Sequence, residues 1–371
     1  MKRALVALFV SLLGFPALVV LLLVGRPAPL LAQHAILYVA PAGACAPFAP
    51  RCFASIQAAV DAAAPGDEIR VAAGVYTDTH VRPRNDALAA GVVTQTVYIS
   101  KTISLRGGYS GDFKAWDPAA YPTTLDSRGR GRGLYIVGDI APTIEGLRIT
   151  GGNAASMGGY VYVGDSDAGG GVYVHAARAV LLNNYIFGNT AYNGGGVFLS
   201  QSAGRLHNNV IAENSAHTAG GLGLLYSPAL VSHNTIRANA SGYMAGGVYL
   251  LFSSAVLSYN AIVSNTAVVF AGGVDMATSP VTSIGNLIAG NAAREAGGML
   301  LWYSHSSLTN DVIADNSALN GGGLWIGGSR PRLLHTTLAR NISGDGVGLY
   351  VGDKGAGPSF IAMTNTLSIS H

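Results

Sequence analysis

The sequence predicts an all-β fold, a right-handed parallel β-helix with coils of about 25 residues and a short N-terminal capping helix. Variants of one phrase, Asn-x-Ile-x-x-Asn-x-Ala, occur seven times between residues 181 and 343, at intervals of 25 or 26 residues. Most copies are followed by a glycine pair and an apolar triplet, as in Gly246-Gly247-Val248-Tyr249-Leu250. A period this regular indicates a repeat architecture.

The residue types in each repeat select strands over helices. Two or three glycines, several asparagines and short runs of Val, Ile and Tyr disfavour helical repeats, and they suit short strands between tight turns. The Leu-x-x-Leu-x-Leu phrase of leucine-rich repeats is missing. A parallel β-helix remains, and the chirality of parallel crossovers predicts that it is right-handed.

The repeated residues predict a core and a ladder of asparagines. The isoleucine of each copy is expected to point inward and to stack on its counterparts in neighbouring coils. The second asparagine is expected at a turn, where it passes amide hydrogen bonds to the coils above and below. The predicted ladder consists of Asn189, Asn214, Asn239, Asn265, Asn291, Asn316 and Asn341.

These phrases resemble those of right-handed β-helix proteins of the pectin-lyase-like superfamily, and more closely the repeats of polymorphic outer-membrane proteins. The phrases of that family are Gly-Gly-Ala-Ile and Phe-x-x-Asn. Here Gly-Gly-Val-Tyr and Ile-x-x-Asn take their place, as in Ile211-Ala212-Glu213-Asn214. The resemblance implies a secreted or surface-displayed β-helix, often adhesive, and it carries over no active-site residue.

The start of the chain predicts an export signal over residues 1–32. Met1-Lys2-Arg3 precedes an almost unbroken apolar run from Ala4 to Val24, and a small residue stands at Ala32. The run is long enough to span a bilayer, so an uncleaved anchor is the alternative. The break at Pro16 favours cleavage, and we expect an exported protein that is extracellular or at the cell surface.

The charge of the chain argues against nucleic acid as a partner. The formal net charge is +3, and without Lys2, Arg3 and Arg26 of the leader the chain has 19 basic and 19 acidic residues. A neutral protein lacks the basic surface that nucleic-acid binding requires. Contact with a membrane is expected only through an uncleaved leader.

Residues 33–76 are predicted to form the N-terminal cap and the first coil. In an exported chain the only two cysteines, Cys45 and Cys52, are expected to form a local disulfide. The stretch from Ser55, a suitable N-cap, to Ala63 has one apolar helical face. Because the open end of a β-helix must be covered, this helix is the predicted cap, and Glu68–Val71 is the predicted first strand.

Residues 77–150 are predicted to form less regular coils with two loop insertions, at 79–96 and 110–132. The basic run Arg128-Gly129-Arg130-Gly131-Arg132 in the second insertion fits an acidic sugar, although such runs are more often solvated loops. The alternation of apolar and polar residues predicts strands at Val97–Ile99, Ile103–Leu105, Leu134–Ile136 and Ile144–Ile149.

Residues 151–371 are predicted to hold the regular repeats of the same continuous domain, 33–371. The last copy of the phrase, Thr364-Asn365-Thr366-Leu367, stops before its second asparagine. We therefore expect the sequence to be truncated at its C-terminus, a piece of a longer protein; the alternative is that this end pairs with another molecule.

The acidic residues do not predict a catalytic pair. Glycoside hydrolases need two carboxylates within roughly 5–10 Å. Glu213 and Asp315 share a column but are four coils apart, roughly 19 Å, and Asp311 replaces a ladder asparagine. No catalytic residue is assigned, although a composite site that includes the insertions stays open. The acidic residues between 181 and 343 are Glu213, Asp275, Glu295, Asp311 and Asp315.

One loop predicts a metal site. Asp165-Ser166-Asp167 precedes three glycines, and an Asp-x-Asp followed by glycine is a pattern that binds calcium, although it is also a common loop sequence. Asp165 and Asp167 are the candidate calcium ligands, and no other cofactor is expected.

The strand after the glycine pair supplies the binding hypothesis. Its flanking residues should point inward and its middle residue outward. Exposed aromatic rings on a parallel sheet suit stacking with sugar rings or contact with a partner protein, unless a loop folds over them. The predicted ligand-binding residues are Tyr173, Phe198, Tyr249 and Trp325. The full outward column is Tyr173, Phe198, Gly223, Tyr249, Asp275, Leu300, Trp325 and Gly348.

The sequence therefore favours non-enzymatic recognition of a polysaccharide or a cell-surface protein, as an adhesin or a scaffold. The alternative is a carbohydrate-active enzyme, either a polysaccharide lyase or a glycoside hydrolase. Two carboxylates meeting in an open groove would favour the enzyme.

Overall fold

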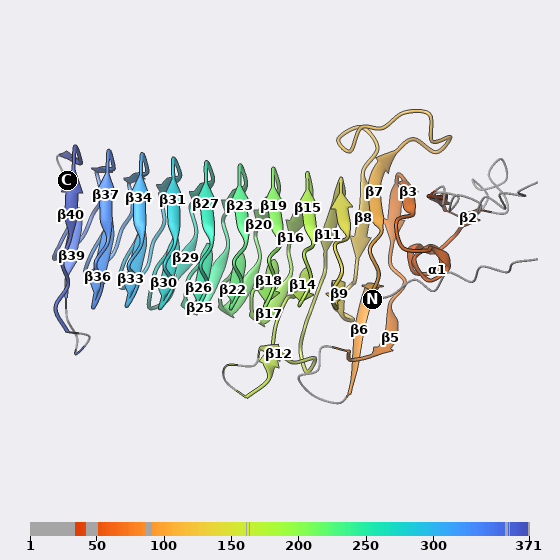
Figure 1. Ribbon diagram of the computed structural model, residues 1–371, viewed down its shortest axis with the longest axis horizontal. Coiled ribbons are helices and arrows are strands. Elements are labelled where there is room, and N and C mark those ends of the chain that lie inside the picture. Colours follow the sequence, from red (N-terminus) through yellow and green to blue (C-terminus); the bar gives the residue numbers. More distant parts are fainter. Residues whose placement is uncertain are drawn as a thin grey trace, which may run out of the picture. The chain divides into compact units, whose positions relative to one another are not determined.

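Three long sheets run from coil to coil through the part of the chain that the structure describes (Figure 1). The computed structural model describes residues 34–41, 51–85, 91–160, 162, 164–352, 355 and 357–369. The predicted leader and Cys45 lie outside these residues, so export and the disulfide with Cys52 stay predictions. No helix in the described ranges is long and apolar enough to cross a membrane.

Each coil contributes one strand to each long sheet, and strands of successive coils pair in parallel. In order along the first sheet, sheet A, the strands are β2 (Cys52–Phe53), β1 (Ile36–Val39), β3 (Glu68–Ala72), β7 (Ser104–Tyr109), β10 (Thr143–Glu145), β15 (Val180–Leu182), β19 (Arg205–His207), β23 (Leu230–Ser232), β27 (Val256–Ser258), β31 (Thr282–Ile284), β34 (Ser307–Thr309), β37 (Arg332–Leu334) and β40 (Ala362–Thr364). Those of sheet B are β4 (Gly74–Tyr76), β8 (Thr123–Asp126), β11 (Leu147–Thr150), β16 (Tyr185–Phe187), β20 (Val210–Ala212), β24 (Thr235–Arg237), β28 (Ala261–Val263), β32 (Leu287–Ala289), β35 (Val312–Ala314), β38 (Thr337–Ala339) and β41 (Leu367–Ile369).

The strands of sheet C follow the glycine pairs, and this sheet carries the candidate site. They are β5 (His80–Pro83), β6 (Val92–Ile99), β9 (Arg132–Val137), β14 (Val172–His175), β18 (Val197–Ser200), β22 (Leu222–Leu225), β26 (Val248–Leu251), β30 (Val274–Ala277), β33 (Met299–Trp302), β36 (Leu324–Gly327) and β39 (Leu349–Val351). Only β5 is antiparallel to its neighbour in this sheet.

Shorter elements complete the coils. The hairpin β12–β13 is antiparallel and extends from the coil before β14 (Figure 1). A four-stranded sheet D precedes the glycine pairs, and it consists of β17 (Thr190–Asn193), β21 (Ser215–Thr218), β25 (Ala240–Met244) and β29 (Thr266–Ala267). The remaining elements are β12 (Gly159–Tyr160), β13 (Ser166–Asp167) and the helix α1 (Ile56–Ala62).

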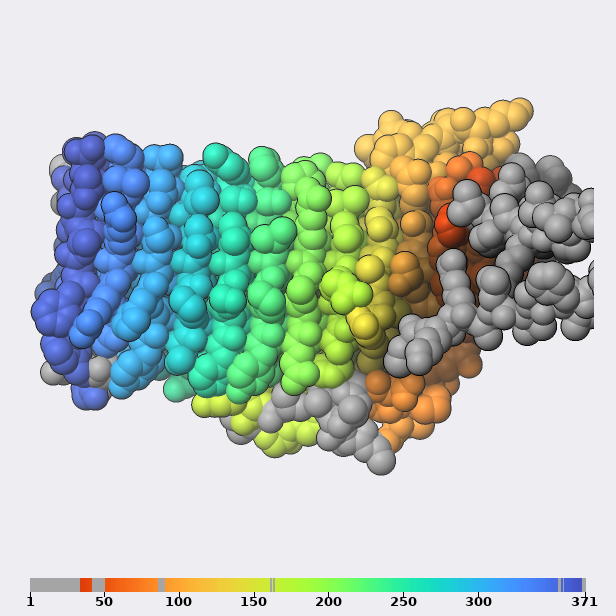
Figure 2. Space-filling model, in the orientation of Figure 1, coloured from red at the N-terminus to blue at the C-terminus, as the bar shows by residue number. Residues whose placement is uncertain are grey.

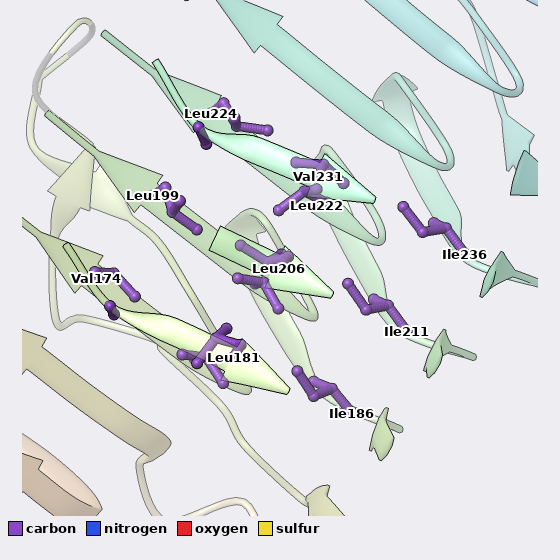
Figure 3. Packing of buried hydrophobic residues seen from close by; sticks show 14 of the residues in the cluster. Val174, Leu181, Ile186, Leu199, Leu206, Ile211, Leu222, Leu224, Val231 and Ile236 are labelled. Atoms are coloured by element: carbon purple, nitrogen blue, oxygen red, sulfur yellow. The ribbon is translucent and has the colours of Figure 1, made fainter. Parts of the chain in front are cut away.

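The interior is one aliphatic stack. In sheet B, Ile186 pairs with Ile211 and Ile211 with Ile236, so the same side chain recurs above itself in successive coils. Figure 3 shows these isoleucines facing the leucines and valines that sheets A and C contribute, among them Leu206 and Leu199. Each of these side chains is at most 1% exposed, and burial of a Leu or Ile side chain stabilises the fold by about 1.5–3 kcal/mol.

Amide hydrogen bonds link the turns of successive coils. Asn239 Nδ2 donates to Oδ1 of Asn265 at 2.9 Å, and Asn265 Nδ2 donates to Oδ1 of Asn291 at 3.0 Å. Each of these amides also donates to a backbone carbonyl, as Asn265 does to Ile236 at 2.9 Å. A second ladder is formed by the first asparagines of the phrases, Asn184, Asn209, Asn234, Asn260 and Asn286, and Asp311 accepts its last bonds. The turn asparagines are therefore fully buried and hydrogen-bonded, as a solenoid interior requires.

The N-terminal region differs from expectation in three places. The prediction of Glu68–Val71 as the first strand is wrong, because β1 (Ile36–Val39) precedes β3 and pairs with it. The first predicted insertion, 79–96, instead contains the hairpin of β5 and β6, which extends sheet C. The second is shorter than predicted, since residues from Thr123 already form β8. The segment between β7 and β8 projects beyond the neighbouring coils (Figure 1 and Figure 2).

Helix α1 packs its apolar face into the main core. Ile56, Ala59 and Val60 are at most 3% exposed and belong to the same cluster as the aliphatic stack. Gln57 pairs with the backbone of Tyr98 in β6, accepting from its N–H at 2.6 Å and donating to its carbonyl at 3.2 Å. Ser55 takes the N-cap position with extended backbone angles, but its side chain makes no capping hydrogen bond.

Candidate functional site

The outer face of sheet C carries a column of side chains in register. Tyr173 pairs with Phe198, Phe198 with Gly223 and Gly223 with Tyr249, and the column continues through Asp275, Leu300 and Trp325. Its next member is Tyr350, so the prediction of Gly348 at this position is wrong by two residues.

The predicted ligand-binding aromatics lie on this outer face, yet the prediction that they are exposed is wrong. The exposed fraction is 0% for Tyr173 and Phe198, 7% for Tyr249 and 2% for Trp325. They belong to two apolar clusters separate from the main core. A second layer of chain therefore covers the outside of sheet C.

The hairpin β12–β13 forms the N-terminal part of this cover. Tyr173 donates its hydroxyl to the carbonyl of Gly159 at 3.1 Å, and the ring of Tyr160 packs edge-on against Phe198 at 5.7 Å. Tyr162, between β12 and β13, packs against Phe252 at the end of β26 with ring centres 5.3 Å apart. The hairpin thus reaches from β14 to β26, across four coils of the column.

Arg132 holds this hairpin down and is buried, whereas the sequence placed it in a basic loop insertion. It belongs to β9 and is 0% exposed. Its Nε donates to the carbonyl of Ala168 at 2.8 Å, and its Nη2 to that of Gly158 at 2.6 Å. The guanidinium lies 5.0 Å from the centre of the Tyr173 ring, within the range of a cation–π contact.

The predicted calcium ligands, Asp165 and Asp167, are hydrogen-bonded within and beside the hairpin β12–β13. Asp165 accepts two hydrogen bonds of 2.6 Å from Arg84, which hold the pKa of its carboxyl below the usual value. Asp167 accepts from the backbone N–H groups of Ser156, Met157 and Gly158 at 2.8–2.9 Å. Across the described ranges, no group of three or more His, Cys, Asp or Glu side chains is placed to hold a metal ion. Arg84 and backbone N–H groups therefore already donate to these two carboxylates.

Beyond the hairpin the cover is incomplete, and a pocket of about 200 Å³ opens at Asp275. Its floor is Asp275 and Ala277 of β30, and its walls come from the neighbouring coils. The lining residues are Met244, Tyr249, Phe270, Asp275, Ala277, Glu295, Leu300, Trp302 and Trp325.

The pocket exists because β30 carries small side chains where its neighbours carry large ones. Ala277 pairs with Leu251 on one side and Trp302 on the other. The indole of Trp302 leans the other way, since a Cβ on Gly327 would come within 2.7 Å of it. Trp302 also stacks on Trp325 with ring centres 5.3 Å apart, so the space above Ala277 stays open.

Asp275 is the unusual residue of the pocket. It is only 2% exposed, and its Oδ1 has no hydrogen-bond partner among the described residues. Burial raises the pKa of its carboxyl to about 7, because the charged form loses its hydration. Perturbed carboxyls in concave apolar sites are typical of functional sites.

Glu295 and Phe270 stand together at the edge of the pocket. Both are half-buried, and they form a bridge between successive coils, in which the N–H of Ala271 donates to the Glu295 carbonyl at 2.9 Å. Asp275 and Glu295 therefore line one cavity, a proximity that the sequence did not predict. The two residues belong to different parts of successive coils, which a reading of single columns does not bring together.

The sequence identified Tyr249, Asp275 and Trp325 of this pocket but missed Trp302, Ala277 and Phe270. Trp302 and Ala277 belong to the fourth position of the strand, where the column is His175, Ser200, Leu225, Leu251, Ala277, Trp302 and Gly327. The small residue Ala277 between the large residues Leu251 and Trp302 is visible in the sequence, and it could have indicated the gap.

The comparison with protein families agrees with the fold. Residues 123–267 match the family model described as a right handed beta helix region, which confirms the predicted fold and its handedness. One solved structure, the crystal structure of pectate lyase Pel9A, is similar over 90% of this chain and 78% of that chain, with 12% identity and a TM-score of 0.35. No curated protein matches the chain. The resemblance to the repeats of polymorphic outer-membrane proteins stays a prediction.

Proposed function

We propose that this right-handed parallel β-helix is an exported recognition protein that binds a polysaccharide, without chemistry, in the pocket formed by Asp275 and Ala277. The observation that carries the proposal is an unfilled position on the outer face of sheet C, where the flanking members of the column, Tyr249 and Leu300, are buried. In a packed protein a gap of this size next to a buried acid costs stability, so its retention favours a role in binding.

The lining of the pocket supports a sugar ring as the bound group. Binding pockets combine apolar and aromatic walls with a few placed polar groups, and pockets for whole drug-sized ligands measure roughly 300–1,000 Å³. This smaller pocket, of about 200 Å³, suits a single ring or a substituent of one. Indole faces contact the apolar C–H face of a sugar, while Asp275 and Glu295 supply hydrogen-bond acceptors. A cell-surface protein that inserts one side chain is the alternative partner.

The finer features of the fold are part of the proposal. Because the coils have about 25 residues each, equivalent residues of successive coils stack in one column. An insertion or substitution in a single coil therefore alters the column at that coil and can create a site there. Helix α1 would cover the open N-terminal end of the core, because its apolar face belongs to the core and Gln57 pairs with the backbone of β6. The leader, residues 1–32, would direct the protein to the cell surface or beyond.

Binding of the exported protein to a polysaccharide array tests the proposal. Ala277→Leu puts into the pocket the side chain that Leu251 supplies one coil earlier, and we expect it to abolish binding. Ala119→Leu, on the exposed segment between β7 and β8, is the matched control and should bind as the wild type does. Equal binding by the wild type and Ala277→Leu would contradict the proposal.

A specific observation supports an enzyme as the second candidate. Asp275, with a pKa of about 7, holds its proton near neutral pH as a general acid must, and Glu295 lines the same pocket. On this alternative the wild type releases new reducing ends from the polysaccharide it binds, and Asp275→Asn and Glu295→Gln do not. Binding without release of sugar by the wild type would exclude it for that polysaccharide.

A further inference from the structure

We propose that the group held in this pocket is the protonated amine of an amino sugar residue, one whose nitrogen carries N–H groups and no acetyl group. The inference rests on the proposed function and names the class of sugar. It is carried by three features of the pocket: its charged groups, an acceptor with no donor, and its aromatic walls.

The ionisable groups of the pocket exclude an acidic sugar. Those that line it are the carboxyls of Asp275 and Glu295 and the phenol of Tyr249, and none of the described lining residues is basic. Burial and the nearby Asp275 raise the pKa of Tyr249 above its ordinary value, so the phenol stays neutral. A uronic acid would bring a third carboxylate into this site, where like charges repel strongly because little water screens them.

Oδ1 of Asp275 lacks a hydrogen-bond donor among the described residues, and an ammonium group supplies one. An ionised carboxylate that is 2% exposed and has one oxygen without a donor is costly to bury. An ammonium N–H donates to that oxygen and also compensates the charge, which makes such hydrogen bonds roughly twice as strong as neutral ones. A sugar hydroxyl would supply only the donor.

The aromatic walls favour the same group. Phe270, Trp302 and Trp325 line the cavity together, and aromatic faces attract cations within about 6 Å of the ring centre, indole most strongly. A quaternary ammonium would satisfy the rings but has no N–H for Asp275. The donor requirement of Asp275 therefore selects an amine with N–H groups.

Binding of an ammonium group beside Asp275 should change the number of protons bound to this carboxyl. Below pH 7 Asp275 is mostly protonated in the free protein, since burial raises its pKa to about 7. A bound ammonium favours the ionised form, so binding at pH 6 should release up to about one proton into the buffer. The other titratable groups that line the pocket are Glu295 and Tyr249, and burial raises the pKa of the Tyr249 phenol, which stays protonated at this pH.

The test is calorimetric titration of the full exported chain with four probes: a trimer of glucosamine, a trimer of N-acetylglucosamine, a trimer of glucose and tetramethylammonium, a cation with no hydrogen-bond donor. We expect the glucosamine trimer to bind at least tenfold more tightly than the other three. Asp275→Asn, which keeps the shape but loses the charge, should weaken its binding about tenfold or more. Titration at pH 6 in two buffers of different ionisation enthalpy should show proton release for the wild type and none for Asp275→Asn.

The outcomes separate the inference from the function it rests on. If the two neutral trimers bind as tightly as glucosamine and Asp275→Asn retains binding, the pocket binds sugar but the cationic class is wrong. If tetramethylammonium binds as tightly as the glucosamine trimer, the hydrogen bond to Asp275 is not the selecting contact and the inference fails. If the glucosamine trimer binds equally to Ala277→Leu, the binding lies elsewhere, and the proposed function fails with the inference.

Discussion

At two coils of this β-helix the outer face of sheet C carries side chains too small to fill their positions, with opposite results. At Gly223 the missing side chain is replaced by a neighbour, because the ring of Phe198 leans into the space. A Cβ on Gly223 would come within 2.7 Å of that ring. At Asp275 and Ala277 the neighbouring Trp302 leans away, over Gly327, and the space stays open.

The comparison of these two gaps shows which interruptions of a solenoid repeat can form a binding site. Every coil supplies the same positions, so a break in the repeat is informative only when the adjacent coils leave it unfilled. The Gly223 gap is filled by the ring of Phe198, which Tyr160 of the hairpin β12–β13 contacts. The Asp275 gap holds a buried acid and lies past the end of that hairpin. Only the second gap has the properties of a binding site.

The largest expected effect is the pH dependence that Asp275 gives to stability. Burial raises its pKa to about 7 in the fold, from an ordinary value of 3.8. Between these values the folded state binds more protons than the unfolded state, so stability is highest at low pH and is lost as the pH rises toward 7. From pH 5 to pH 8 the free energy of unfolding of the wild type should fall by about 3 kcal/mol more than that of Asp275→Asn.

Urea denaturation at pH 5 and pH 8 measures this difference. Asp315→Asn is the control, because Asp315 is half-exposed and its bond to Arg340 lowers its pKa. A lowered carboxyl pKa affects stability only as the pH falls toward it, so this variant should keep the wild-type change between pH 5 and pH 8. An identical pH profile for the wild type and Asp275→Asn would show that the carboxyl is not buried as described.

The second prediction compares the two gaps by filling each with leucine. Gly223→Leu forces a side chain into the ring of Phe198, and overpacking of this kind costs about 1–3 kcal/mol. Ala277→Leu enters open space and should change the free energy of unfolding by less than about 1 kcal/mol. Thermal or urea unfolding of the two variants decides, and equal losses would mean that the gaps do not differ.

The smallest expected effect is a difference close to zero between two ladder positions. Asn214 and Asn265 lie in turns of the coils around the two gaps, and both accept from the previous asparagine and donate to the next. Replacement of either by alanine should cost about 1–3 kcal/mol, because buried donors are left unpaired. The two losses should agree within about 0.5 kcal/mol. A much larger loss at one site would show that the two coils differ in the stability of their turns, and not only in the side chains on their outer face.

The fold and its register could be predicted because a constant period fixes which residues stack. Spacing alone placed Ile186 above Ile211 and aligned Tyr249 with Asp275 in one column, as the structure does. The error at Gly348 arose where the glycine pair is lost and the column passes to Tyr350.

The site itself could be predicted only in part. Exposure of the column depends on the hairpin β12–β13, which belongs to no repeat and packs across several coils. Whether a gap is filled depends on the direction in which Phe198 and Trp302 lean, and spacing does not determine a rotamer. The sequence therefore singled out Asp275 as an interruption, and the structure was needed to show that Glu295 lines the same cavity.

Tryptophan fluorescence during titration with the polysaccharide identified on the array tests whether the ligand binds in the pocket at Asp275 and Ala277. Trp302 and Trp325 line the pocket, and Trp116, the third tryptophan of the chain, lies on the segment between β7 and β8. We expect a saturable change in emission for the wild type and for Ala119→Leu, and no change for Ala277→Leu. The same saturable change in Ala277→Leu would contradict this prediction, because the ligand would then bind outside the open gap.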